Sequence, residues 1–359
     1  MKRQLLFRLC VLLLCLLSLL SLAACGESVA YSKDVFAMDT VMTLTAYGPK
    51  AEAALTAGEA VILSMDAMLD PEPDDPETSP SYVYKLNHAH GASIAVPGQV
   101  ARMVQTAQTV YQQSNKLGIN SLDLTIYPLV KLWGFSDGSY RVPFGSDISE
   151  ARSRLHFDQV VLSSFPSSGS YEVSIPDACE ITFGAVAKGC TAAYVIDAMR
   201  NAGVTSGIIS LGGNVQTLGL KPDGSKWRIG IADPNSPENY LGILSAGEIA
   251  VVTSGSYQRN FTDPLTGKFY HHIIDPRTGS PCDNSLLSVT VICEDGAMAD
   301  ALSTAMFVMG ETNALRYWRT YGRDFQMILV TKDNEVVCTS GLIEEFSLEN
   351  QNYTLRFSE

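Results

Sequence analysis

The sequence predicts a single compact α+β domain in which mixed or antiparallel β-sheets are combined with inserted helices. Along the second half of the chain, many short segments alternate apolar and polar residues, a pattern typical of strands. Helical periodicity occurs between groups of strands rather than strictly after each strand, which favours α+β over a doubly wound parallel sheet. No internal repeat and no second change of composition divides the chain.

The first half of the chain predicts one strand, two helices and an exposed loop. A strand is expected at 35–47 and helices at 50–69 and 101–117, because apolar residues recur there with the periods of a strand and of a helix. The segment 70–80 holds four prolines and five acidic residues, so a regular element is not expected there.

The second half of the chain predicts mostly strands. A helix at 190–201 comes first, with Gly203 placed to end it. The segments expected to be strands are 208–220 (a hairpin), 227–231, 249–261, 269–274, 286–293, 325–331 and 335–339, and those expected to be helices are 297–309 and 313–321.

The first 24 residues predict a secretory signal peptide. They begin with basic residues, continue with an apolar run at 9–20 and end in small residues before Cys25. The segment 22–25 resembles the lipobox of bacterial lipoproteins, in which such a cysteine is lipidated; an ordinary signal peptide is the alternative. Because two acyl chains hold a protein stably, lipid on Cys25 (a diacylglyceryl group and palmitate) would place the chain on the outer face of the cell membrane. The expected organisation is therefore a lipoprotein signal peptide at 1–24, a lipidated tether at 25–33 and one catalytic domain at 34–359.

The charge of the chain argues against two classes of partner. The net charge is −13, and removal of residues 1–24 takes away three basic residues, which leaves 22 basic against 38 acidic residues, or −16. Nucleic acids and anionic membranes are bound by patches of Lys and Arg. We therefore expect no nucleic acid partner and no polybasic contact with a membrane.

Five cysteines remain after Cys25, and their spacing shows no metal-binding pattern. An odd number of thiols and the absence of a C-x-x-C pair favour buried free cysteines that behave as small apolar residues. Disulfides are compatible with an extracytoplasmic location, but the sequence does not pair them.

Asp300 and Thr304 predict a metal site. They lie at positions i and i+4 of the predicted helix 297–309, so a carboxylate and a hydroxyl share one face, one turn apart. Two hard oxygen ligands suit Mg²⁺, which takes one or two protein carboxylates and completes its shell with phosphates and water. The segment therefore indicates phosphoryl or pyrophosphate chemistry.

A glycine-containing loop at 183–189 carries Lys188 and leads into the helix 190–201. Backbone N–H groups at the start of a helix, together with a lysine, can bind an anion. The order Gly-Lys-Ser/Thr of a Walker loop is missing. A purely structural turn between a strand and a helix is the alternative.

Two further segments carry polar groups that suit a ligand site. Asp123 and Thr125 point to the same side of an extended segment, near Trp133 and Phe135, which could form an apolar wall; packing in the core is the alternative. Arg259 follows a run of hydroxyl residues and could pair with a phosphate, or form a surface ion pair.

Two histidines at 271 and 272 precede the turn 275–279. An imidazole with an ordinary pKa of about 6.5 can serve as a general base near neutral pH. A structural histidine is the alternative, and the turn by itself explains only the reversal of the chain.

Taken in order, these segments resemble the ApbE-type FAD:protein FMN transferases, a family of flavin transferase lipoproteins with a fold related to the T-fold. The resemblance covers nearly all of the chain beyond the signal peptide. The segments that carry it are 38–40, 81–87, 123–128, 184–189, 210–214, 254–259, 272–279 and 299–304.

The resemblance implies a Mg²⁺-dependent reaction in which FAD is split at its pyrophosphate, AMP leaves, and FMN is joined to a Thr or Ser hydroxyl of an extracytoplasmic flavoprotein subunit. It implies His272, rather than His271, as the base, together with a catalytic Asp300. It assigns Mg²⁺ to the carbonyl of Ala185 and to Asp300 and Thr304. Flavin contacts would fall on Met38, Asp123, Leu124, Thr125, Lys188 and Ile274.

Two positions depart from the family pattern. Thr182 stands where the family usually has an acidic residue, and Cys190 stands where it usually has tyrosine. Neither change removes an expected metal ligand.

Two other functions use the same residues. An FAD pyrophosphatase would pass the phosphoryl group to water and release FMN and AMP. A flavin-binding lipoprotein would hold FAD without cleaving it, but storage needs no metal at the pyrophosphate. The sequence does not identify the acceptor protein, and we find no convincing acceptor motif within the chain.

Overall fold

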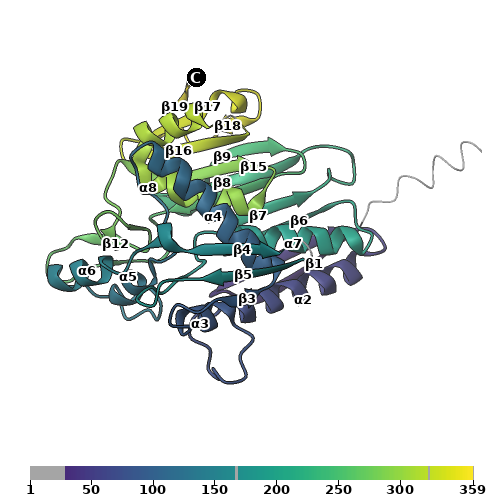
Figure 1. Cartoon of the computed structure of the whole chain (residues 1–359). Coiled ribbons are helices and arrows are strands. Elements are labelled where there is room, and N and C mark those ends of the chain that lie inside the picture. Colours follow the sequence, from purple (N-terminus) through teal and green to yellow (C-terminus); the bar gives the residue numbers. More distant parts are fainter. Residues whose placement is uncertain (1–28, 166–168, 322–323, 359) are drawn as a thin grey trace, which may run out of the picture.

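A nine-stranded mixed sheet forms the centre of the molecule in the computed structural model, which describes residues 29–165, 169–321 and 324–358 (Figure 1). The strand order is β1-β2-β6-β7-β10-β15-β16-β17-β19. Neighbouring strands are antiparallel except for β17 and β19, which are parallel. The prediction of one α+β domain with mixed sheets is confirmed.

The helices and strands have the following bounds. The strands are β1 Ala30–Ala37, β2 Thr40–Tyr47, β3 Ile94–Val96, β4 Val161–Phe165, β5 Ser170–Ser174, β6 Gly207–Leu211, β7 Asn214–Leu218, β8 Trp227–Asp233, β9 Ser236–Ala246, β10 Ala250–Gly255, β11 Asn260–Thr262, β12 Phe269–His271, β13 Ile274–Asp275, β14 Ser280–Pro281, β15 Leu286–Cys293, β16 Phe325–Thr331, β17 Glu335–Thr339, β18 Phe346–Leu348 and β19 Thr354–Ser358. The helices are α2 Ala51–Leu69, α3 Tyr82–Asn87, α4 Gly98–Lys116, α5 Tyr127–Leu132, α6 Gly145–Arg152, α7 Ala187–Asn201 and α8 Gly296–Thr320, with short 3₁₀ turns at Phe157–Gln159 and Ser340–Leu342.

Helices cover one face of the large sheet, and a small sheet covers the other. α2 and α7 pack on β1, β2, β6 and β7, while α8 packs on β10 and β15. On the opposite face, β8, β9 and β18 form a three-stranded sheet. Its Trp227 and Ile229 join one apolar cluster with Val251 and Ile328 of the large sheet. Every second residue of β8 is buried, as packing of one sheet face on another requires.

A further layer lies outside α8. α4 packs on α8 and on β5, and β5 is the middle strand of the sheet β3-β5-β4, which Figure 1 shows in front of the helices. Val104 of α4, Val173 of β5 and Phe307 of α8 belong to the same apolar cluster. α8 is therefore enclosed between two layers, which explains why it is apolar on nearly all sides.

The first predicted strand, at 35–47, is in fact two strands joined by a tight turn. Met38 and Asp39 both have positive φ, at 48° and 57°, and the N–H of Met38 donates to Asp66 Oδ1 (2.8 Å). The sequence lacks the glycine that usually marks such a turn, so the turn was not predicted. The first strand also begins earlier than expected: residues 30–33 pair with 44–47, so the last part of the expected tether 25–33 belongs to β1.

Other boundaries differ for similar local reasons. The segment 249–261 is broken into β10 and β11, and 269–274 into β12 and β13. The two predicted helices at 297–309 and 313–321 form one element, α8, with a kink at Gly310, whose φ is 73°. The strands β9, β18 and β19 and the sheet β3-β5-β4 were not predicted, because most of these strands are short and β9 is exposed along its first half, which leaves weak hydrophobic periodicity.

The starts of α7 and α8 touch through two glycines. A Cβ added to Gly189 would lie 2.0 Å from the carbonyl oxygen of Gly296, and one added to Gly296 would lie 2.7 Å from the carbonyl oxygen of Gly189. Side chains at these positions would push the helices apart. The glycines therefore fix how closely the two helix starts approach each other.

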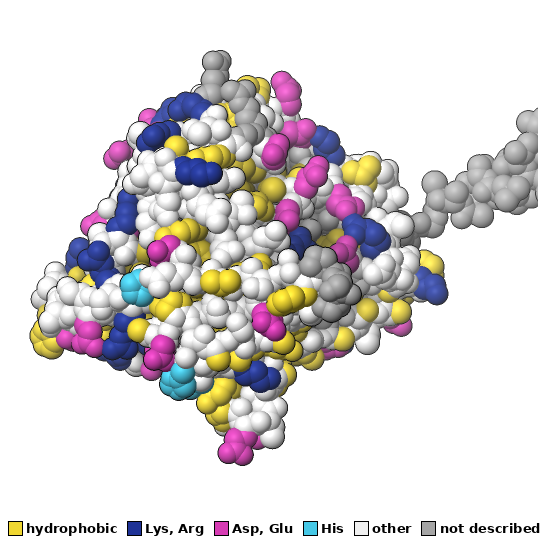
Figure 2. All heavy atoms as spheres, viewed as in Figure 1, with side chains coloured by type: hydrophobic (Ala, Val, Ile, Leu, Met, Phe, Trp, Pro, Cys, Tyr) yellow, Lys and Arg dark blue, Asp and Glu magenta, His cyan; other side chains and the backbone are white. Residues whose placement is uncertain are grey.

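Charged side chains of both signs are mixed on the surface. On the face shown in Figure 2, Lys and Arg side chains are interspersed with Asp and Glu.

The cysteines were expected to be buried and free. Within the described ranges, the cysteines at 179, 190, 282, 293 and 338 are buried free thiols, as predicted. No helix in those ranges is long and apolar enough to cross a bilayer. The expected signal peptide at 1–24 and Cys25 lie outside the described residues.

Replacement of Gly189 by alanine should destabilise the domain by about 3 kcal/mol, because the new methyl group overlaps the backbone of α8. Gly184 in the same loop provides a matched control, since a Cβ there would approach Thr182 no closer than 3.7 Å. Urea unfolding of G189A and G184A would measure the difference. Equal free energies of unfolding would show that the helices can separate without loss.

Candidate active site

A cavity of about 930 Å³ lies against the start of α8, at the edge where several loops meet. Its walls come from the β1–β2 turn, the end of α2, the segment 121–127, the loop 182–188, the end of β10, the segment 272–276 and α8. Segments that are far apart in the sequence thus enclose one space, and its size is that of a site for a sizeable organic ligand.

Eight residues expected at the site share this cavity: Met38, Asp123, Ala185, Lys188, His272, Ile274, Asp300 and Thr304. Leu124 and Thr125, which were expected to contact the flavin, lie behind the wall. Leu124 belongs to the apolar core, and Thr125 is fully buried. Their contribution to the site is therefore indirect.

Asp300 is held by the helix contact described above. Asp295 caps the start of α8 by accepting hydrogen bonds from the N–H groups of Ala297 and Met298, and Asp300 lies one turn further on. The N–H of Gly189 donates to Asp300 Oδ2 (2.8 Å). Burial raises the pKa of Asp300, while the charge of Lys188 and the backbone N–H groups act in the opposite direction. A buried carboxylate with one nearby cation is a position that a further cation would stabilise.

Thr304 belongs to a group of hydroxyls between α8 and β10. Ser254 Oγ lies 2.8 Å from Ser303 Oγ and 3.3 Å from Thr304 Oγ1, and Ser303 Oγ donates to the carbonyl oxygen of Asp300 (2.9 Å). These bonds restrict the rotamers at the start of α8. Ser254 itself also lines the cavity.

The residues at this end of the cavity fit a hard cation. Asp300 has a carboxylate, Thr304 a hydroxyl and Ala185 a backbone carbonyl, and the three residues line the same space. Oxygen donors with few charges suit Mg²⁺, which keeps part of its shell for phosphate and water. In the described part of the chain, three or more His, Cys, Asp or Glu side chains do not come together as a metal cluster, so a cation here would depend on this mixed set.

His272 is a neutral base in the free protein. Burial lowers its pKa to about 3, and the charges of Lys188, His271 and Arg259 add to this effect. Its Nδ1 is buried and has no hydrogen-bond partner among the described residues. His271, by contrast, lies in β12, and its Nε2 donates to the carbonyl oxygen of Cys282 (2.9 Å). The neighbouring histidines are therefore distinct: His272 lines the cavity and His271 is structural.

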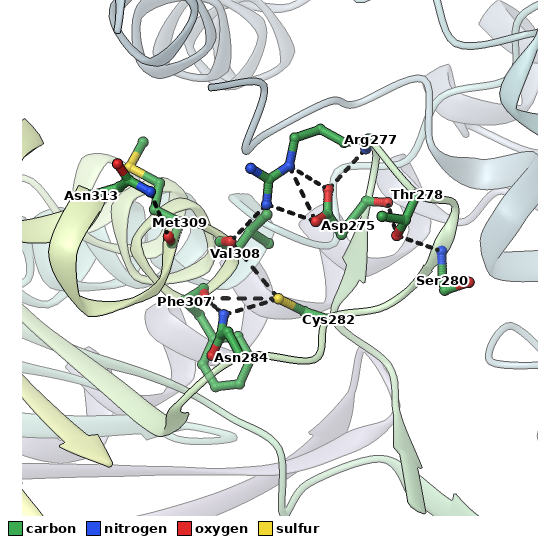
Figure 3. A network of polar contacts seen from close by, with 10 residues as sticks. All are labelled: Asp275, Arg277, Thr278, Ser280, Cys282, Asn284, Phe307, Val308, Met309 and Asn313. Carbon is green, nitrogen blue, oxygen red and sulfur yellow. Dashed lines mark hydrogen bonds and ion pairs between the residues drawn. The ribbon is translucent and has the colours of Figure 1, made fainter. Parts of the chain in front are cut away.

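The turn after β13 joins the cavity wall to the middle of α8. Figure 3 shows the guanidinium of Arg277 facing the carboxylate of Asp275 and the carbonyl oxygen of Val308. Arg277 donates to Asp275 Oδ1 and Oδ2 (2.9 and 2.7 Å) and to Val308 O (3.2 Å). Asn284 donates in the same way to Phe307 O (2.6 Å). The turn therefore does more than reverse the chain, because it fixes Ile274 relative to α8.

Asp123 is a buried carboxyl group on another wall. Its Oδ1 accepts hydrogen bonds from the N–H and the hydroxyl of Thr125 (2.8 and 2.5 Å), and the same hydroxyl accepts one from the N–H of His156 (3.0 Å). Burial nevertheless raises the pKa of Asp123 to about 6. Thr125 thus orients Asp123 from behind the wall.

Two neighbouring segments had alternatives that the sequence left open. Phe135 lines the cavity, but Trp133 does not form a wall: it is buried, and its Nε1 donates to the carbonyl oxygen of Gly279 (2.9 Å). Arg259 lies at the cavity and pairs with Asp39 of the β1–β2 turn (3.2 Å). The alternative of an ion pair is therefore realised at the edge of the site.

The two positions that depart from the family pattern have clear structural roles. Thr182 lines the cavity, and its Oγ1 accepts a hydrogen bond from the N–H of Gly184 (3.3 Å). Cys190 is fully buried in α7. Thr182 thus supports the loop that carries Ala185 and Lys188.

Sequence reasoning missed Asn214 as a separate site residue. It lines the cavity from the start of β7. The feature of the sequence that could have identified Asn214 is a polar residue directly after two glycines and at the start of a buried strand.

A family model confirms the relation that the motifs indicate. The model of the ApbE family matches residues 38–329, a range that contains every predicted wall residue. The chain belongs to the ApbE family. A protein of Klebsiella pneumoniae (strain 342) named FAD:protein FMN transferase is 34% identical over 275 residues, which are 76% of this chain and 82% of that protein.

Solved structures of ApbE proteins share the fold. The ApbE protein of Thermotoga maritima superposes with a TM-score of 0.77 at 24% identity, over 88% of this chain and 98% of that one. The apo form of the flavinyl transferase ApbE of Pseudomonas stutzeri gives a TM-score of 0.70 at 29% identity, over 85% of this chain and 92% of that one.

In this ApbE protein, replacement of Asp123 by asparagine should stabilise the fold at high pH only. The folded-state pKa of Asp123 is raised from 3.8 to about 6, so stability is lost as the pH rises through this interval and the buried group ionises. D123N avoids that loss and should gain about 2–3 kcal/mol over the wild type at pH 8, with little difference at pH 3.5. Urea unfolding at both pH values measures this.

The exposed Asp34 of β1 serves as the control. D34N reports the effect of removing an exposed carboxylate under the same conditions. A D123N difference that does not change with pH would contradict burial as the cause.

Proposed function

We propose that this chain is a Mg²⁺-dependent FAD:protein FMN transferase that acts on a Thr or Ser hydroxyl of an extracytoplasmic redox protein. The observation that carries the proposal is that five residues line one cavity: Ala185, Lys188, His272, Asp300 and Thr304. Relatives named FAD:protein FMN transferase support it.

The reaction exchanges one P–O bond for another. The acceptor hydroxyl oxygen attacks the phosphorus on the FMN side of the FAD pyrophosphate. The bond from that phosphorus to the bridging oxygen breaks, and AMP leaves with the bonding electrons. The hydroxyl proton passes to a base, and FMN ends as a phosphoester on the acceptor.

Charge and position are the main contributions of the protein. Lys188 lies at the start of α7, where its ammonium group and the adjacent backbone N–H groups favour phosphate oxygens. Asp300, Thr304 and the Ala185 carbonyl would hold Mg²⁺, which supplies Lewis-acid stabilisation of charge that develops on the pyrophosphate. Fixed dipoles and charges of this kind are typically a large part of phosphoryl-transfer catalysis.

His272 is the base in this proposal. In the free protein its imidazole is neutral at physiological pH, because burial and nearby cations lower its pKa to about 3. A bound pyrophosphate adds negative charge beside Lys188 and so offsets the effect of the lysine charge on the pKa of His272. His272 would therefore become a stronger proton acceptor when the substrate is present.

The remaining walls suit the ring systems of the substrate. Met38, Phe135 and Ile274 give apolar surface, while Asp123 gives a hydrogen-bonding carboxyl group. Mostly apolar walls with a few polar groups are typical of cofactor sites.

The proposed location depends on Cys25. A lipid on this residue would hold the domain at the outer face of the cell membrane, where an acceptor subunit would meet it. The mature net charge of −16 disfavours attachment through basic residues.

Replacement of Asp300 by asparagine should lower the rate of FMN transfer by about 10²–10³-fold, because a neutral side chain binds Mg²⁺ poorly and no longer opposes the charge of Lys188. The full-length protein in detergent is incubated with FAD, Mg²⁺ and co-purified extracytoplasmic proteins. Covalent flavin is read as fluorescence of denatured protein bands and as the FMN mass increment, and omission of Mg²⁺ should give the same loss.

Glu311 in the same helix provides the control, since it pairs with Arg356 away from the cavity and E311Q should keep normal transfer. Release of FMN and AMP without any covalent flavin would identify a pyrophosphatase. Undiminished processing of FAD by D300N would refute the proposal.

Replacement of Cys25 by serine should move the protein from the membrane fraction to the soluble extracytoplasmic fraction, because the thiol is the lipid attachment point. Cell fractionation with immunodetection measures this, and C179S is the matched control because Cys179 is buried in the fold. Retention of C25S in the membrane by an unprocessed signal peptide would be recognised from its larger mass. A processed C25S that stays with the membrane would contradict lipid anchoring.

A further inference from the structure

Asn214 is a buried wall residue of the cavity that the roles above do not use. It begins β7 directly after Gly212 and Gly213, which have φ of 58° and 88°. The residue is 1% exposed to solvent and is one of those that line the cavity. Asn214 is paired with Val252 of β10, and the N–H of Thr253 donates to the carbonyl oxygen of Gly213 (3.3 Å). The backbone of this position is therefore fixed by the central sheet.

The side-chain amide of Asn214 has no protein partner for either of its polar atoms. Among the described residues, neither Oδ1 nor Nδ2 is within a hydrogen bond of any other group. An unsatisfied buried polar group is unfavourable, and native proteins keep few of them. An amide in which both donor and acceptor are free, on the wall of a cavity, is a group that a ligand would complete.

The chemistry of the amide restricts that ligand group. Nδ2 donates and Oδ1 accepts, so the two atoms are satisfied together only by a group that presents an acceptor beside a donor. Phosphate oxygens are only acceptors and would leave Oδ1 unpaired. A planar ring edge with adjacent N–H and C=O or N atoms satisfies both, in the way that asparagine pairs with the edge of adenine.

We infer that Asn214 binds such a donor–acceptor ring edge of the dinucleotide and so contributes to the choice of substrate. This inference rests on the proposed function, because FAD is taken as the ligand. FAD offers such an edge in each of its two halves: at the imide of the flavin ring, and at the 6-amino group of adenine beside N1 or N7. Binding of the separate halves distinguishes them.

The test replaces Asn214 by leucine, which has nearly the same shape, and by alanine as a smaller variant in case leucine disturbs folding. The full-length protein in detergent is titrated with FAD, riboflavin and AMP, in the presence of EDTA so that FAD is not cleaved. Flavin fluorescence and titration calorimetry give the affinities, and thermal unfolding gives the Tm of the free protein.

Gln216 provides the matched control. It lies two residues further along β7, is 7% exposed and also has an unpartnered amide oxygen, but it is not a wall residue of the cavity. Q216L should bind all three ligands as the wild type does.

We expect N214L and N214A to weaken FAD binding by about tenfold or more. The same loss should occur with riboflavin and not AMP if the flavin edge is bound, or with AMP and not riboflavin if the adenine edge is bound. The Tm of free N214L should equal or exceed that of the wild type, because no protein hydrogen bond is lost. A residue needed only for structure would instead lower the Tm.

Unchanged affinity for all three ligands in both variants would overturn the inference, as would an equal loss for riboflavin and AMP. A wild-type protein that binds no FAD would instead overturn the proposed function, and the two failures are thus distinguishable.

Discussion

The contact between the starts of α7 and α8 is the constraint on which the site depends. Because Gly189 and Gly296 have no side chains, the two helix backbones approach closely, and the N–H of Gly189 reaches the carboxylate of Asp300. The same approach brings Lys188, on α7, into electrostatic range of Asp300 on α8. A carboxylate and an ammonium group from distant parts of the sequence are thereby held at one cavity, without a direct ion pair being needed to place them.

The strands with strong hydrophobic periodicity were predictable from the sequence, whereas a tight turn and several partly exposed strands were not. β15, β16 and β17 lie where alternation and apolar runs placed them, because burial in the central sheet imposes that pattern. The turn at Met38 and Asp39 was missed because methionine does not signal positive φ and no glycine accompanies the aspartate. The strands β9 and β18 were missed because their outer residues are exposed, which leaves little hydrophobic signal.

The site was predictable where motifs carry chemistry, and less so where the fold decides orientation. Asp300, Lys188 and His272 share the cavity as the motifs implied. Thr125 and Trp133 turned inward instead, since a hydroxyl can serve Asp123 and an indole can serve a backbone carbonyl. Whether such a side chain faces ligand or protein depends on tertiary packing, which single-sequence patterns do not encode.

The buried thiols have a consequence for how the domain can be handled. Burial raises the pKa of Cys190, Cys282 and Cys338 to about 12 and also raises that of Cys179 and Cys293. Since thiolates are the reactive species, native molecules should resist alkylating reagents and oxidants, and an oxidising compartment would not force cross-links on them. The rate at which these five side chains are alkylated should therefore report how often the fold opens. The position of each modified cysteine would show which part of the fold had opened.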